Sequence, residues 1–170
     1  MALPLAKKRI NPDNAGPIIL GWLHKFNLTV RSHTDPDYEF FYTVTTDGGK
    51  TVGVHQSKRY QSDYITFQST ISQTAESKEY IKELSAAEKL QAIQEVKLAL
   101  SQAVMGYSST NMLEEYTIFK RLPIGMSLTE DRVIDAIWSM EAIVNTTQTL
   151  EAIAVRRHKS LIGKGDYPQV

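Results

Sequence analysis

Residues 38–56 carry the clearest secondary-structure signal in the chain and read YEFFYTVTTDGGKTVGVHQ. Residues 38–45 are rich in aromatic and β-branched side chains, and residues 51–56 alternate in polarity, and both patterns favour β-strands. Between them, Asp47-Gly48-Gly49 predicts a hairpin turn, because glycine accepts the positive φ that such turns require. We therefore expect two antiparallel strands joined at this turn.

The segments on either side of the hairpin add further strands and three helices. Proline in a first helical turn, apolar residues at helical spacing and the two capping boxes mark the helices, whereas alternation marks the strands. The expected elements are a helix from Gly16-Pro17 to about Asn27, strands over Leu28–His33 and Tyr64–Ile71, a helical turn over 76–84, a helix from Ser85 to Gly106, a strand over Tyr116–Lys120, and a last helix from Ser127 to about His158.

Together these elements predict an α+β fold with two layers. Short connections between successive strands favour an antiparallel sheet, with helices mainly on one face and the order α-β-β-β-β-α-β-α. The length of 170 residues and a hydrophobic content of 42% suit one packed domain over residues 1–170. We expect residues 1–11 and 160–170 to form flexible tails.

Composition excludes several classes of protein. Cysteine is absent, which excludes a disulfide scaffold, a thiol nucleophile and zinc sites built on thiolates. Lys+Arg and Asp+Glu both number 19, so no net charge steers the chain toward nucleic acid or a membrane. The N-terminal charges follow the few apolar residues, an order opposite to that of a secretory signal, so we expect a cytoplasmic protein with no membrane span.

The order of elements resembles the type III secretion chaperone-like fold, and most of all an archaeal family of unknown function with that fold. The helix containing Trp22, the hairpin at Asp47–Gly49 and the last helix capped at Ser127 carry the resemblance. The chain departs from it in having four strands before the middle helix, where the chaperones have three. The resemblance implies a homodimer that binds an extended polypeptide segment, and it implies no catalytic residues.

The last helix is unusually long for a chain of this size, because its apolar residues keep a helical period to about His158. Either Asn145-Thr-Thr-Gln-Thr149 divides it into two helices, or its distal half packs on a second copy of the chain, and we favour the second reading. Trp138, Val144 and Leu150 are then the expected interface residues of a homodimer.

The strands supply a second expected interface. Side chains alternate along a strand, so Phe40 and Tyr42 share one face and Phe41 lies on the other. If the helices cover one face, the opposite face presents aromatic side chains to solvent or to a partner, and Phe41 and Tyr60 are the residues that we select. The alternative is a sheet that is covered on both faces.

His33, Asp35 and Asp37 form the most suggestive polar group, because imidazole and carboxylates can share a divalent metal. The same residues are explained by a reverse turn, for which aspartate and proline are favoured, so we assign no metal site and keep the three as candidates. His55 joins them only if the strand registers align.

We therefore expect a non-enzymatic binding module without a cofactor, a homodimer that takes up a peptide or protein segment as a chaperone or adaptor does. Two alternatives stay open. One is a small-molecule or metal-binding enzyme that uses the region of His33, Asp35 and Asp37. The other is nucleic-acid binding through the basic clusters Lys7–Arg9 and Arg156–Lys159, which the zero net charge disfavours.

Overall fold

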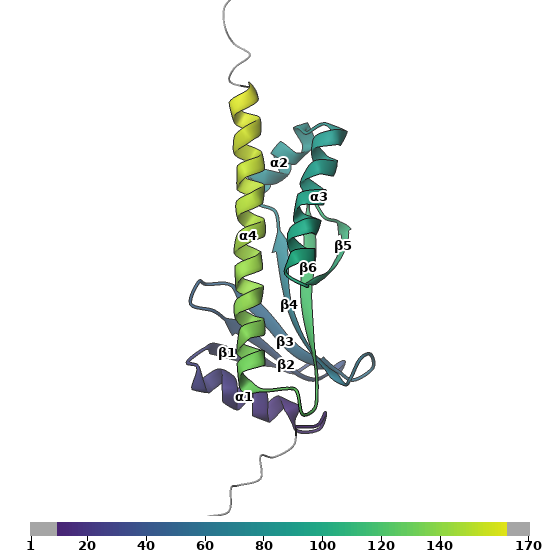
Figure 1. The fold of residues 1–170 in the computed structure, drawn as a ribbon, viewed down its shortest axis with the longest axis vertical. Coiled ribbons are helices and arrows are strands. Elements are labelled where there is room, and N and C mark those ends of the chain that lie inside the picture. The colour runs from purple at the N-terminus through teal and green to yellow at the C-terminus, as the bar shows by residue number, and fades with distance from the viewer. Residues whose placement is uncertain (1–9, 163–170) are drawn as a thin grey trace, which may run out of the picture. The chain divides into compact units, whose positions relative to one another are not determined.

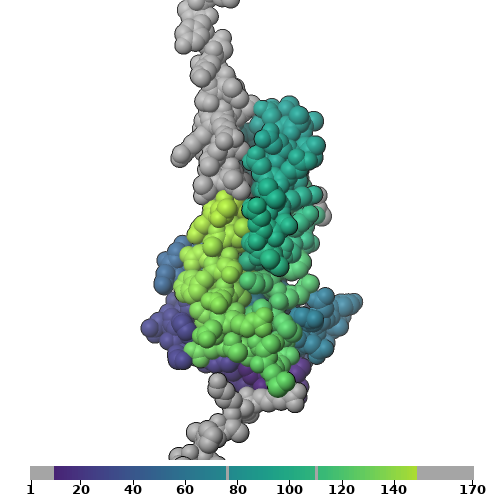
Figure 2. Space-filling model, viewed as in Figure 1, coloured from purple at the N-terminus to yellow at the C-terminus, as the bar shows by residue number. Residues whose placement is uncertain are grey.

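A computed structural model describes the backbone of residues 10–162 and the side chains of residues 10–148 other than Glu76 and Thr110, which are the coloured atoms of Figure 2. The chain forms two compact units. The first comprises Met1–Gln68 and Lys120–Glu141, and the second comprises Ser69–Phe119 and Ala142–Val170. The single-domain organisation expected from the sequence stays a prediction.

Residues 10–162 contain four helices and six strands (Figure 1). The strands form one open antiparallel sheet in the order β1-β2-β3-β4-β6-β5, so the α+β class and the predicted element order are confirmed, with β5 as an additional strand before β6. The elements are α1 Ala15–Lys25, β1 Thr29–His33, β2 Tyr38–Thr45, β3 Thr51–Ser57, β4 Tyr64–Ser72, α2 Ala75–Glu83, α3 Ala86–Gln102, β5 Gly106–Asn111, β6 Glu115–Pro123 and α4 Glu130–Ile162.

The predicted hairpin joins β2 to β3 in the first unit. The amide of Thr46 donates to the carbonyl of Lys50 at 2.9 Å, and that of Gly49 donates to the carbonyl of Thr46 at 2.9 Å. Gly49 has a φ of 73°, the left-handed conformation for which glycine is favoured. The turn sets a register in which Phe41 lies opposite His55.

The strand β2 contains an irregularity between Tyr38 and Phe40, where the register with β3 shifts. A bulge of this kind places an extra residue in one strand and changes the phase of the side-chain alternation. The Phe40 ring stacks on Tyr42 and lies against Gly16 of α1, where an added Cβ would be 2.8 Å from Phe40 Cδ1. The Tyr38 ring instead contacts Phe41, so Tyr38 and Phe41 share the opposite face.

In the second unit, α3 begins at the predicted capping box, because Ser85 and Glu88 cap each other's backbone amides. The helix ends at Gln102, earlier than the predicted end at Gly106. Val104 takes a left-handed φ of 54°, and the next amide, that of Met105, donates to the carbonyl of Leu100 at 3.0 Å, which closes the helix end. The residues that follow form β5, a strand that the sequence did not predict, paired with β6.

The helix α4 is one helix of 33 residues and is not divided at Asn145–Thr149 (Figure 1). Within this continuous helix, the hydroxyls of two threonines bond back to carbonyls of the preceding turn. Thr146 Oγ1 donates to the carbonyl of Ala142, and Thr147 Oγ1 donates to that of Ile143, both at 2.9 Å. The helix continues past His158 to Ile162, so residues 160–162, which we expected in a tail, are helical. Of the two predicted tails, residues 1–9 and 163–170 lie outside the described residues.

The start of α4 differs from the predicted capping box. Thr129 is the residue whose Oγ1 accepts from the amide of Arg132, at 3.4 Å, so the cap lies two residues after Ser127. The carboxylate of Glu130 pairs instead with Lys25 of α1 at 2.6 Å. Over residues 10–162, no helix has both the length and the apolar character that crossing a bilayer requires.

Gly106 provides a test of the β5–β6 pairing. It lies opposite Phe119, and a Cβ at Gly106 would overlap the Phe119 ring. We expect Gly106→Ala to lower the free energy of unfolding by about 1–3 kcal/mol, because the ring must move from its place on the glycine. Urea unfolding followed by circular dichroism measures the change.

The matched control for this substitution is Gly21→Ala. An added Cβ at Gly21 has no atom within 4 Å, and alanine favours a helix over glycine, so stability should stay equal or rise by up to about 1 kcal/mol. Equal losses from the two variants would contradict the contact between Gly106 and Phe119.

Candidate functional site

Four aromatic rings gather on one face of the sheet in the first unit, and we call His33, Tyr38, Phe41 and His55 the histidine–aromatic face. The ring centroids of Phe41 lie 5.0 Å from His33, 5.5 Å from Tyr38 and 5.8 Å from His55. Tyr38 meets His55 edge to face at 4.6 Å. These separations lie in the range in which aromatic rings attract one another.

Strand pairing produces this arrangement. His33 of β1 and His55 of β3 both lie opposite Phe41 of β2, so three side chains form one row across the sheet. Gly53 makes room for the row, because an added Cβ there would be 3.2 Å from Phe41 Cε2 and 3.1 Å from Gln68 Cγ. The Phe41 ring therefore leans over the glycine, a contact that compensates for the missing side chain in a strand.

His55 is the most unusual residue of the face. It is only 7% exposed, and neither ring nitrogen has a hydrogen-bond partner of ordinary geometry among the described residues. Burial lowers the pKa of His55, with Arg121 adding to the effect; the amide of Gln68 acts in the opposite direction. Burial therefore favours the neutral form of the His55 ring.

His33 has a different environment. Its Nε2 lies 2.6 Å from Thr43 Oγ1 on the neighbouring strand, and the residue is partly exposed. One imidazole of the face is thus hydrogen-bonded within the sheet, whereas the other keeps unused polar atoms beneath the rings of Tyr38 and Phe41.

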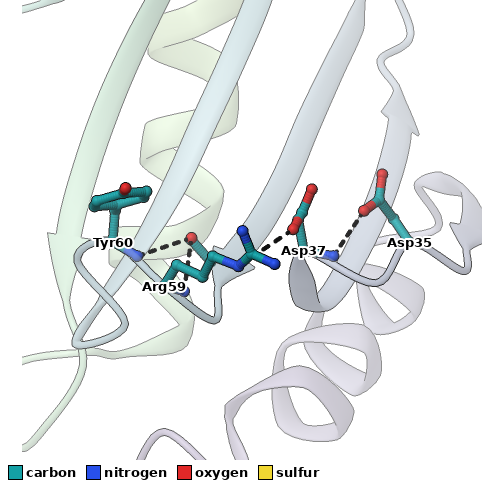
Figure 3. Close-up of polar contacts among 5 residues, drawn as sticks. Asp35, Asp37, Arg59 and Tyr60 are labelled. Atoms are coloured by element: carbon teal, nitrogen blue, oxygen red, sulfur yellow. Dashed lines mark hydrogen bonds and ion pairs between the residues drawn. The ribbon is translucent and has the colours of Figure 1, made fainter.

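A polar loop region adjoins one end of this face (Figure 3). The Oδ1 atom of Asp35 accepts from the amide of Asp37 at 2.9 Å, and Asp37 pairs with Arg59 at 3.6 Å between exposed side chains. The Tyr60 ring stands apart from the two carboxylates and is 80% exposed. Exposed ion pairs contribute little to stability, so this pair mainly orients the two loops.

The three metal candidates therefore have separate roles. Asp35 stabilises the turn, Asp37 faces Arg59, and His33 bonds to Thr43. Among the described residues, no three or more His, Asp or Glu side chains gather as metal ligands would. His33 and His55 both lie opposite Phe41, so the strand registers align the two histidines as a shared site requires. The alignment produces ring contacts rather than a convergent set of ligands.

The expected interface residues fall into two groups. Phe41 and Tyr60 belong to the sheet face and its adjoining loop, in the first unit. On α4, Trp138 is 36% exposed, whereas Val144 is 4% exposed and packs within the chain itself. The side chain of Leu150 lies outside the described residues. Their roles in binding stay predictions.

Comparison with known proteins places the chain in a family. Residues 18–150 match the family described as "Uncharacterized conserved protein (DUF2299)", and this range includes the whole histidine–aromatic face. The chain belongs to the DUF2299 family. Its membership confirms the expectation of a family without a known function.

The DUF2299 chain also resembles a solved structure, an uncharacterized protein from Methanothermobacter thermautotrophicus. The two share 19% sequence identity with a TM-score of 0.68, over 84% of this chain and 96% of the other. At that identity the likeness supports the fold alone. No curated protein matched the chain.

The pH dependence of stability tests the state of His55 in this DUF2299 chain. Because burial lowers its pKa below the ordinary 6.5 in the folded chain, the unfolded chain takes up the proton first as pH falls. The contribution of His55 is constant above about pH 6.5 and declines as the pH falls toward the folded pKa. We expect His55→Gln to be less sensitive to pH than the wild type in urea unfolding between about pH 7.5 and about pH 5.

His24→Gln is the control for the loss of an imidazole as such, because His24 lies exposed on α1, outside the histidine–aromatic face. Parallel profiles for the wild type and His55→Gln would show that His55 titrates alike in both states and would contradict its burial as a neutral ring.

Proposed function

We propose that the chain is a non-enzymatic binding module that takes up a peptide or protein segment on the histidine–aromatic face, and that it acts as a cytoplasmic homodimer in the manner of a chaperone or adaptor. The contact cluster of His33, Tyr38, Phe41 and His55 carries the proposal. It joins aromatic surface to polar ring atoms, a combination that protein interfaces favour.

The exposure of its rings supports binding of a segment on the histidine–aromatic face of the folded chain. Tyr38, Phe41 and His33 are partly exposed in the folded chain, and Tyr60 extends the aromatic surface into the adjoining loop. A partner that covers these rings removes apolar area from water without requiring the sheet to open.

The long helix α4 supports the homodimer. It is continuous over 33 residues and carries Trp138, an exposed tryptophan, on its N-terminal half. Large exposed aromatic residues are frequent anchors of interfaces between subunits. The resemblance to the type III secretion chaperone-like fold belongs to the same proposal, since chaperones of that class are small dimers.

Selection of peptides tests the uptake of a segment. We expect the immobilised full chain to enrich short extended peptides from a displayed random library, and the Kd of each selected peptide to rise about tenfold or more in Phe41→Thr, which keeps a β-branched residue in the strand but removes the ring. Fluorescence anisotropy with the synthesised peptides measures the loss.

Tyr107→Thr is the matched control, because Tyr107 is an aromatic residue on β5 of the second unit with 41% exposure. Circular dichroism verifies that both variants fold. Selected peptides that bind Phe41→Thr as tightly as the wild type would disprove uptake on the histidine–aromatic face.

The homodimer has its own test. We expect sedimentation equilibrium to give twice the monomer mass for the wild type, and Trp138→Lys to weaken the dimer by about tenfold or more, since a buried unpaired charge opposes association. Met126→Lys, at a residue that is 88% exposed outside the helices, should leave the dimer intact. A wild type that stays monomeric at high concentration would contradict the dimer.

A further inference from the structure

The strand β1 is an edge strand of the sheet, and its residue His33 belongs to the histidine–aromatic face. One edge of β1 pairs with β2, and the other edge pairs with no described strand. All five of its residues pair with β2, which holds the strand in place. An edge strand directs alternate amide and carbonyl groups outward, where a further strand can pair with them.

Two side chains of β1 lie on the same face as Phe41. His33 lies opposite Phe41 and Arg31 lies opposite Thr43 of the same strand, so the two residues share one face of the sheet at a spacing of two. His33 contacts the Phe41 ring. Arg31 is exposed and forms no ion pair with any described residue. The open edge therefore presents an aromatic contact next to an unneutralised cation.

A second copy of β1 fits this edge poorly. In the antiparallel register that pairs all five residues of Thr29–His33 with their counterparts, Arg31 would lie directly opposite Arg31 of the other copy. Like charges that face each other across two strands destabilise the pair. The charge of Arg31 instead complements a strand that carries an acidic residue at that position.

We propose that an extended peptide adds to the outer edge of β1 as an antiparallel strand, with an aromatic residue opposite His33 and an acidic residue opposite Arg31. This inference rests on the proposed uptake of a polypeptide segment and specifies where the segment lies and what it contains. The direction follows from the sheet, in which the strand pairs are antiparallel, and antiparallel pairing is the more stable per residue.

The direction sets the sequence that the site recognises. In an antiparallel strand the residue opposite His33 precedes the residue opposite Arg31, so the peptide reads aromatic, any residue, acidic. The intervening side chain points to the other face of the sheet. The aromatic residue extends the row formed by His33, Phe41 and His55, and the carboxylate pairs with Arg31.

Synthetic peptides test this arrangement on the full chain. The probe is a labelled heptapeptide, Thr-Thr-Tyr-Thr-Glu-Thr-Thr. One control peptide has tyrosine and glutamate adjacent, which sends them to opposite faces, and a second has lysine in place of glutamate. We expect both controls to bind about tenfold more weakly than the probe in fluorescence anisotropy. Two further probes carry N-methyl groups on alternate amides, one on the odd-numbered and the other on the even-numbered residues. Only the probe whose methylated amides face β1 should lose binding.

Variants of the chain distinguish the ion pair from a general charge effect. Arg31→Glu should reverse the preference, so that the lysine peptide binds more tightly than the glutamate probe, and Arg31→Gln should abolish the preference. Lys78→Glu, which reverses an exposed charge on α2 in the second unit, should leave the preference unchanged. Circular dichroism confirms that each variant is folded.

Three outcomes would overturn the inference: no binding of the probe, an unchanged preference in Arg31→Glu, or full binding of both N-methylated probes. The proposed function is judged separately by the library peptides and Phe41→Thr. If those peptides depend on Phe41 but not on Arg31, the face binds a segment without strand addition at β1, and only the further inference fails.

Discussion

The register between β2 and β3 is the constraint on which the candidate site depends. The hydrogen bonds of the turn, between Thr46 and Lys50 and between Gly49 and Thr46, determine which residues of the two strands face each other. With that register Phe41 lies opposite His55. A slip by one residue would send every side chain of a strand to the other face, so the buried side of β2 and β3, with Tyr42, Val44, Val52 and Val54, and the histidine–aromatic face are specified together.

The parts of the fold that sequence analysis predicts well are those with local signals. The segment Asp47–Gly49 predicts its turn, and Ser85 with Glu88 predicts the start of α3, because both features depend on neighbouring residues alone. The strand β5 is missed because its residues, GYSSTN, are small or polar apart from Tyr107 and show no apolar alternation. Its pairing with β6 comes from tertiary context, which overrides weak β-propensity.

The candidate site is only partly predictable for the same reason. Alternation alone places Phe41 on the face opposite Phe40, and the exposed ring of Tyr60 could be selected from its position in a polar loop. The burial of His55, in contrast, depends on strand pairing and on the ring of Tyr38, and neither is visible in the sequence around it. For His33, Asp35 and Asp37, the turn preference of aspartate and proline already spoke against a metal site, but the contacts of His33 with Thr43 and of Asp37 with Arg59 could not be predicted from the sequence.

The irregularity at the start of β2 has a consequence for the density of rings on the sheet. Tyr38 and Phe41 are an odd number of positions apart, so an undisturbed strand would present them to opposite sides. The shift in register lets one short strand supply both rings to a single side while Phe40 and Tyr42 stack on the other. The extra residue, Glu39, is thus accommodated in the irregularity, and the four rings alternate across the sheet as they would on four consecutive positions of a regular strand. A strand shortened by this one residue would therefore keep both aromatic layers.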